Sequence, residues 1–207
     1  MHKKLMLAAT AVMMLAACNG SKTTPLAAQF DDNAPKSVRI VSEKIDTTVI
    51  VKNGQLKFNV PVDLTTLTYA HAGRSIYSFI SDGSKITLNQ EDGKAYSDNE
   101  KGVHTHYLEF ITWRDDFMAA YNKRVNEIGD DKEAFDAYLQ EVLAPYNDYL
   151  KETLKANRDN ALGVMALNQM SIDDPNEMLS LINTLSSEMK ERPEVIQMKK
   201  ACEEELK

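Results

Sequence analysis

Cysteine is nearly absent from this chain of 207 residues, which contains only Cys18 and Cys202. Two cysteines so far apart cannot form the Cys-x-x-Cys pair of a dithiol oxidoreductase. Basic residues are also scarce, because 24 lysines and arginines stand against 31 aspartates and glutamates, for a formal net charge of −7. An acidic balance argues against a nucleic-acid partner and against electrostatic attachment to anionic lipid.

Long hydrophobic runs are missing as well. The apolar stretch Leu5–Ala17 is shorter than the roughly 20 residues that span a bilayer. It follows Lys3 and Lys4 and ends in small residues, as a secretory signal peptide does. The run Leu15-Ala16-Ala17-Cys18 resembles the lipobox of bacterial lipoproteins, in which the thiol is acylated and the bond before the cysteine is cut. We therefore expect a signal peptide over 1–17 and lipid on Cys18, with a non-lipidated secretory signal as the alternative.

Lipid on Cys18 would provide the membrane attachment that the rest of the chain lacks. Each buried CH₂ contributes about 0.8 kcal/mol, and stable anchoring takes more than one acyl chain, which a multiply acylated Cys18 would carry. Asn19 after the cysteine is compatible with an outer-membrane lipoprotein facing the periplasm, the location that we expect. Residues 18–35 are small, polar and interrupted by proline, which predicts a flexible tether.

Residues 36–99 carry the signals of β structure. The runs Val38–Val41 and Thr47–Val51 are rich in β-branched residues, and Asn53-Gly54 precedes the alternating stretch Gln55–Val60. Asn-Gly between two such runs predicts a hairpin. Three more strands are expected over 67–70, 75–80 and 85–89. Their spacing predicts a small antiparallel β-sandwich or barrel.

Residues 100–207 change to a helical period and predict an all-α domain, so the expected fold class is α+β. Apolar residues from Tyr107 to Ile128 mark one long helix, and a second follows Asp130 with Pro145 inside it, where a kink or split is expected. Further helices are expected over 161–170, after Asp174-Pro175 and from Pro193. Tyrosines at helical spacing predict core packing rather than a sugar-stacking surface: Tyr107, Tyr121, Tyr138, Tyr146 and Tyr149.

His104 and His106 are the candidates for a metal site, with Glu109 and His71 as further possible ligands. Histidines at i and i+2 share a face in an extended segment and could bind Zn²⁺ or Cu²⁺ there. In a helix they diverge by about 200°, and chelation fails. No third ligand is determined by spacing, so no metal site and no cofactor is predicted.

No other constellation indicates catalysis, and we expect a protein that is not an enzyme. Arg114 is predicted to pair with an acid at the junction of the β and α parts. Cys202 follows Val195 and Met198 on one helical face, which predicts a buried, inert thiol. The neighbouring acids Glu203–Glu205 would oppose a lowered thiol pKa.

The layout of the chain is similar to a known family region. The elements that carry the resemblance are the lipobox, the turn at Asn53-Gly54 with Gln55-Leu56-Lys57-Phe58, the strand Lys85–Leu88 after Asp82-Gly83, and the helical segment containing Asn157–Gly163. Together they resemble the N-terminal region of envelope-anchored thiol–disulfide oxidoreductases, the thioredoxin-like group related to alkyl hydroperoxide reductase and thiol-specific antioxidant proteins. In that family a thioredoxin domain follows, and no cysteine here matches its redox pair, so no catalytic residue can be transferred.

These observations predict a lipid-anchored envelope protein that acts as a non-catalytic binding or accessory module. Its expected partners are the membrane, through lipid on Cys18, and a protein of the envelope. One alternative is a truncated or split oxidoreductase whose thioredoxin domain is lost or encoded separately. Another is a lipoprotein that binds a metal or small ligand through His104 and His106.

Overall fold

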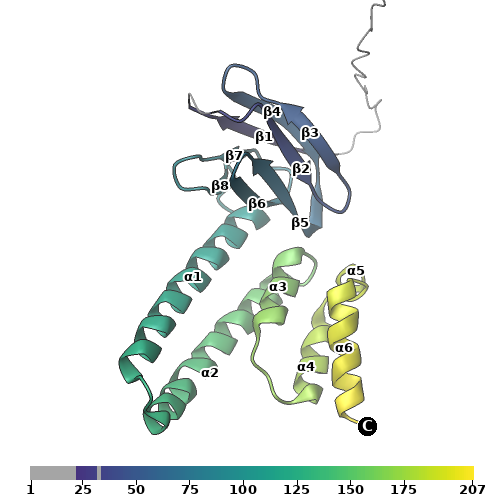
Figure 1. Ribbon diagram of the computed structural model, residues 1–207. Helices are drawn as coiled ribbons and strands as arrows, with labels where there is room; N and C mark the ends of the chain where they lie inside the picture. Colours follow the sequence, from purple (N-terminus) through teal and green to yellow (C-terminus); the bar gives the residue numbers. More distant parts are fainter. Residues whose placement is uncertain (1–21, 32–33) are drawn as a thin grey trace, which may run out of the picture.

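The computed structural model describes residues 22–31 and 34–207 (Figure 1). The predicted signal peptide and the lipidation of Cys18 lie outside these residues. Eight strands precede six helices, which confirms the predicted α+β class. The strands are β1 (Thr23–Gln29), β2 (Ser37–Val41), β3 (Asp46–Ile50), β4 (Gln55–Pro61), β5 (Asp63–Ala72), β6 (Ser75–Ser81), β7 (Ile86–Leu88) and β8 (Ala95–Ser97). The helices are α1 (Val103–Ile128), α2 (Lys132–Ala156), α3 (Ala161–Gln169), α4 (Pro175–Thr184), α5 (Ser187–Lys190) and α6 (Pro193–Glu205).

The strands form two separate four-stranded sheets, in the orders β4-β1-β7-β8 and β3-β2-β5-β6. All named pairs are antiparallel except β1 with β7, which is parallel. Side chains from both sheets meet in one core, so the β region is a sandwich rather than a closed barrel. That core includes Leu26, Leu56, Val38, Ile40, Tyr77 and Phe79.

The flexible tether predicted over 18–35 is wrong for residues 23–29, which form the inner strand β1. Thr24, Leu26 and Ala28 alternate with exposed or half-buried neighbours, as in a strand with one face in a core. β4 pairs along the whole of β1, whereas β7 pairs only with Leu26–Ala28. Pro25 therefore lies beyond the stretch that has a neighbour on both sides, where a missing N–H is tolerated. The small residues of this segment gave no strand signal in the sequence, because the strand is stabilised by pairing with β4 and β7.

The turn predicted at Asn53-Gly54 is present, but the hairpin prediction is wrong because the strands on either side of the turn, β3 and β4, do not pair along their length. Asn53 has φ 52° and Gly54 φ 74°, the positive values that a type I′ turn needs. Beyond a single bridge between Lys52 and Gln55, however, the chain crosses over, since β3 and β4 belong to different sheets. The Gly54 carbonyl accepts a hydrogen bond from Phe30 N at 2.8 Å, which fastens the crossing turn to the end of β1.

The helices build a second core that reaches the β region through Ile80 of β6. α3 fills its centre, with six of its residues buried. Pro145 does not split α2, which runs unbroken through it, and the cap of α2 is Asp131 rather than the expected Asp130. Buried side chains of the described residues run from Thr24 to Val195. The buried members contributed by helices include Phe110, Leu150, Leu154, Leu162, Leu167, Ile182, Met189 and Val195.

α1 is attached to the sandwich at its first turn. The Asp82 carboxylate, in the loop after β6, accepts a hydrogen bond from His104 N at 3.0 Å and so caps the helix from outside. A Cβ on Gly102 would lie 2.5 Å from that carboxylate, which explains a glycine here. The hydroxyls of Tyr107 and Ser78 are 2.7 Å apart and fix the next turn to β6.

Candidate functional site

The far parts of α1 and α2 project from the rest of the molecule as an arm, which we define as residues 111–149. Figure 1 shows α1 and α2 converging at the turn that joins them, away from the sheets and from α3–α6. The buried residues of α1 are confined to its base, and those of α2 to its last two turns. Within the arm no side chain is fully buried. Ile111, Trp113, Tyr146 and Tyr149, at the base of the arm, pack against the helical core as half-buried residues, and the rest of the arm extends beyond both cores.

An aromatic ladder joins the two helices of the arm. Trp113 stacks on Tyr149 with ring centroids 3.7 Å apart, and Phe117 lies 4.6 Å from Tyr146. Tyr121 stacks on Tyr138 at 5.8 Å nearer the tip. The tyrosines expected to pack in a core do pack, yet only Tyr107 is buried, and those of the arm stay half-buried. Each pair contributes about 0.5–1.5 kcal/mol beyond the area that it buries.

A groove of about 620 Å³ runs along α1 beside this ladder, and we call it the α1 groove. Leu108, Trp113 and Phe117 supply its apolar surface. Glu109 and Asp116 lie along it together with Thr105 and Thr112. By helix geometry Glu109 and Asp116 lie along the middle of this face, with Leu108 on one side and Trp113 and Phe117 on the other. An open groove that combines apolar side chains with carboxylates has the composition of a surface that binds a partner.

The two carboxylates of the α1 groove, Glu109 and Asp116, make no hydrogen bond or ion pair with any described residue. The nearby cation Arg114 is bound to its neighbour Asp115, with Nη2 2.7 Å from Oδ1. The prediction that Arg114 pairs with an acid at the junction of the β and α parts is therefore wrong. Its charge is matched locally on the arm, and the groove keeps its negative edge.

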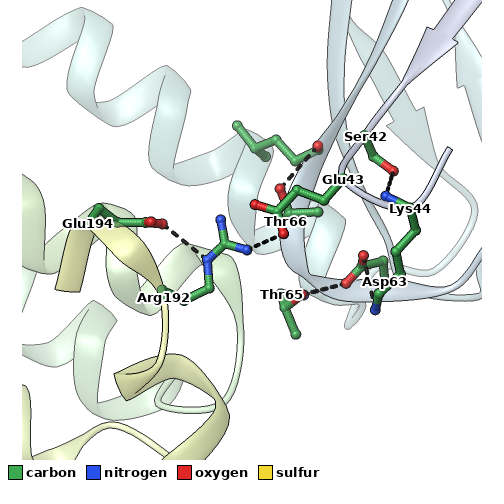
Figure 2. Close-up of polar contacts among 9 residues, drawn as sticks. Ser42, Glu43, Lys44, Asp63, Thr65, Thr66, Arg192 and Glu194 are labelled. Carbon is green, nitrogen blue, oxygen red and sulfur yellow. Dashed lines mark hydrogen bonds and ion pairs between the residues drawn. The ribbon is translucent and has the colours of Figure 1, made fainter. Parts of the chain in front are cut away.

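A different arginine, Arg192, holds that junction, and Figure 2 shows it between Glu43 and Glu194. Arg192 Nη1 lies 2.6 Å from Glu43 Oε2, in the loop between β2 and β3, and Nε donates to Glu194 Oε1 at 3.2 Å. The arginine side chain is only 15% exposed. Sequence reasoning missed this contact because the two partners are 149 positions apart. No local signal marks such a pair.

A second polar group lies beside it at the start of β5 (Figure 2). Lys44 Nζ is 3.1 Å from the buried carboxylate of Asp63, which also accepts from Thr65 N and Oγ1. Burial raises the pKa of Asp63, but the hydrogen bonds from Thr65 and Lys44 outweigh it and hold the pKa below its usual range. These groups neutralise one another.

A cavity of about 200 Å³ adjoins Arg192, between β5, α3 and the start of α6. Because Arg192 is already bound to two carboxylates, it has no net charge to offer an anionic ligand. The ion pairs of Arg192 therefore connect the β and α layers. The α1 groove is the better candidate for binding.

The structure does not bring His104 and His106 together. Both lie in the first turns of α1, where His104 points into the interior and His106 is exposed. His104 Nε2 lies 2.9 Å from the Ala95 carbonyl and Nδ1 accepts from Ile80 N at 3.4 Å, so the hydrogen-bond partners assign the proton to Nε2. Burial lowers the pKa of His104. Among the described residues, no group of three His, Cys, Asp or Glu side chains is arranged to hold a metal ion.

Cys202 is a free, half-buried thiol on α6, less enclosed than its helical pattern predicted. Burial raises its pKa, and the charges of Glu205 and Glu203 raise it further, as the acidic neighbours predicted. A raised pKa disfavours the thiolate that redox or nucleophilic chemistry requires.

The candidate site for binding is therefore the α1 groove, which begins at the base of α1 and extends onto the arm. Neither α1 nor α2, nor any other described helix, combines the length and apolarity needed to cross a membrane. In comparisons with known proteins, no family model, no curated protein and no solved structure matches this chain.

Proposed function

We propose that this protein is a lipid-anchored module of the bacterial cell envelope that binds a partner protein and has no catalytic role. The observation that carries the proposal is the arm, with its half-exposed aromatic ladder and the α1 groove. Helices of 26 and 25 residues extend beyond the cores that stabilise their bases. Fold stability alone gives no reason for a groove with partly exposed apolar side chains there, whereas recognition of a partner does.

The anchoring part of the proposal rests on the lipobox ending at Cys18. Four residue steps separate Cys18 from Lys22, whose carbonyl already accepts a hydrogen bond from Val62 N at 3.2 Å. At most 3.6 Å per residue, these steps span no more than about 14 Å. A lipid on Cys18 would thus hold the sandwich close to the bilayer, without the long tether that composition predicted.

Metabolic labelling with a palmitate analogue in a bacterial host tests the anchor. The wild-type chain should incorporate label and sediment with membranes, and Cys18→Ala should abolish both. Cys202→Ala removes the other thiol and should change neither. Two results would overturn the proposed lipid anchor. One is label that is still incorporated by Cys18→Ala, and the other is wild-type protein that carries no label and is found in the soluble fraction.

The resemblance to oxidoreductase N-terminal regions remains a prediction. Under it, the bound partner would be a redox enzyme of the envelope, and this chain would position it. Cys202, with a raised pKa and acidic neighbours, does not favour thiol chemistry by this chain itself.

A further inference from the structure

We infer that the α1 groove binds a cationic amphipathic helix of the partner protein. The inference rests on the proposed function and names the chemistry of the partner. The groove extends along α1 from Thr105 to Phe117, which is about 18 Å of helix axis, or three turns. At about 100° per residue, Leu108 lies on the opposite side of α1 from Phe117, with Glu109 and Asp116 between them. A second helix laid along the groove would place apolar side chains at i, i+3, i+4 and i+7 against Trp113 and Phe117, and basic side chains over Glu109 and Asp116.

Charge complementarity specifies the sign of the partner. Glu109 and Asp116 are seven residues apart on one side of α1, about 10 Å along the axis. Both are exposed, and neither has an ionic partner among the described residues. Two lysines or arginines seven residues apart on a partner helix would match that spacing.

The surrounding charge favours the same occupant over two others. Between Ile111 and Tyr149 acidic residues outnumber basic ones by more than two to one. Two copies of the arm would place like charges against each other, which disfavours a second copy of this chain. Anionic lipid headgroups would be repelled for the same reason, which disfavours the bilayer.

Trp113 makes the inference directly measurable, because it is the only tryptophan in the chain and lines the groove. The protein for the assay is the chain from residue 18 with Cys18→Ala, which keeps both cores. The probe is a synthetic helical peptide of about 18 residues with a leucine stripe and two lysines seven residues apart. Trp113 emission should change saturably with the peptide. Affinity should fall as sodium chloride is raised to about 1 M, where the Debye length shrinks to about 3 Å.

Charge variants separate the groove from the overall acidity of the arm. Glu109→Gln with Asp116→Asn should weaken peptide binding about tenfold. Glu141→Gln with Asp148→Asn removes the same charge at the same spacing from exposed positions of α2 outside the groove, and affinity should stay within about twofold. A peptide with glutamates in place of its lysines should not bind.

Three results would overturn the inference. One is the absence of a saturable change with the lysine peptide up to about 1 mM, and another is equal weakening by the two double variants. The third is a dimer in solution that buries Trp113 and dissociates on Glu109→Arg, which would make a second copy the occupant. The assay uses unlipidated protein, so failure of the groove leaves the palmitate result standing, and failure of the anchor leaves peptide binding standing.

Discussion

Gly163 has no room for a side chain. A Cβ built on it would lie 2.0 Å from the Asn157 carbonyl oxygen and 2.8 Å from the carbonyl carbon, so α3 starts in direct contact with the backbone at the end of α2. The corner is tightened by two buried asparagines, since Asn160 Nδ2 donates to Asn157 Oδ1 at 3.1 Å. Backbone atoms cannot move aside as the end of a flexible side chain can.

Gly163→Ala should therefore lower the free energy of unfolding by about 2–3 kcal/mol. Helix propensity alone predicts the opposite sign, because alanine is favoured over glycine by about 1 kcal/mol inside a helix. Urea unfolding followed by far-UV circular dichroism distinguishes the two. A variant as stable as the wild type would contradict the contact.

His104 should make stability depend on pH in the neutral range. Burial lowers its pKa in the folded protein, so the unfolded chain takes up the proton more readily. The stability that neutral His104 confers is complete above the unfolded pKa of about 6.5 and is lost as pH falls below it, until the folded pKa is passed. Unfolding free energies of the wild type should therefore decline between pH 7.5 and 5.5.

Two single variants test this pH dependence of the unfolding free energy, one at each histidine of the first turn of α1. His104→Gln should be less stable at every pH, because Ala95 O and Ile80 N lose a well-placed partner, and its slope should be flatter. His106→Gln, at an exposed position, should retain the wild-type slope. Identical slopes for the wild type and His104→Gln would show that another group titrates.

At the scale of the elements, α2 contains one residue that destabilises the helix in which it lies. Pro145 is exposed and lies in the interior of α2, where it lacks an N–H and crowds the carbonyl of Glu141. Pro145→Ala should raise the free energy of unfolding by about 1–3 kcal/mol, measured by urea unfolding. Gln140→Ala, also exposed on the same helix, should change it by less than about 0.5 kcal/mol. A destabilised Pro145→Ala would mean that the arm depends on the local shape that proline imposes.

The elements also show how far sequence reasoning reached. Helix starts were predictable where a cap or a proline acts within a few residues: Asp174 accepts from Asn176 N at 2.9 Å, and Pro193 opens α6. β1 was missed because Thr23–Gln29 has weak strand propensity, and only pairing with β4 and β7 makes it a strand. The α1 groove had a partial signal in the aromatic spacing of α1, but which residues of α2 stack on Trp113 depends on how the two helices meet.

At the scale of the whole molecule, the early start of β1 predicts a short distance between the β-sandwich and the bilayer, which can be measured. A fluorophore placed by Thr23→Cys in a Cys202→Ala background should lie within about 20 Å of the bilayer in lipid vesicles carrying the lipidated protein, because few residues separate it from Cys18. Energy transfer to a headgroup-labelled lipid measures this. Insertion of a Gly-Ser segment of about 15 residues after Asn19 should reduce the transfer markedly. Equal transfer with and without the insertion would mean that the sandwich contacts the membrane by itself.

The sequence by itself determined the features that act over a few residues. These are the order of strands before helices, the turn at Asn53-Gly54, the helix starts at Asp174-Pro175 and Pro193, and the helical placement of the aromatic residues. Backbone propensity, turn chemistry and capping are local, so they can be read from neighbouring positions. Only the tertiary structure decided that β1 is an inner strand, that Arg192 bonds Glu43 and that Trp113 stacks on Tyr149 beside an open groove. Each of these joins distant parts of the chain, where burial and charge pairing in the folded molecule, rather than local preference, select the partner.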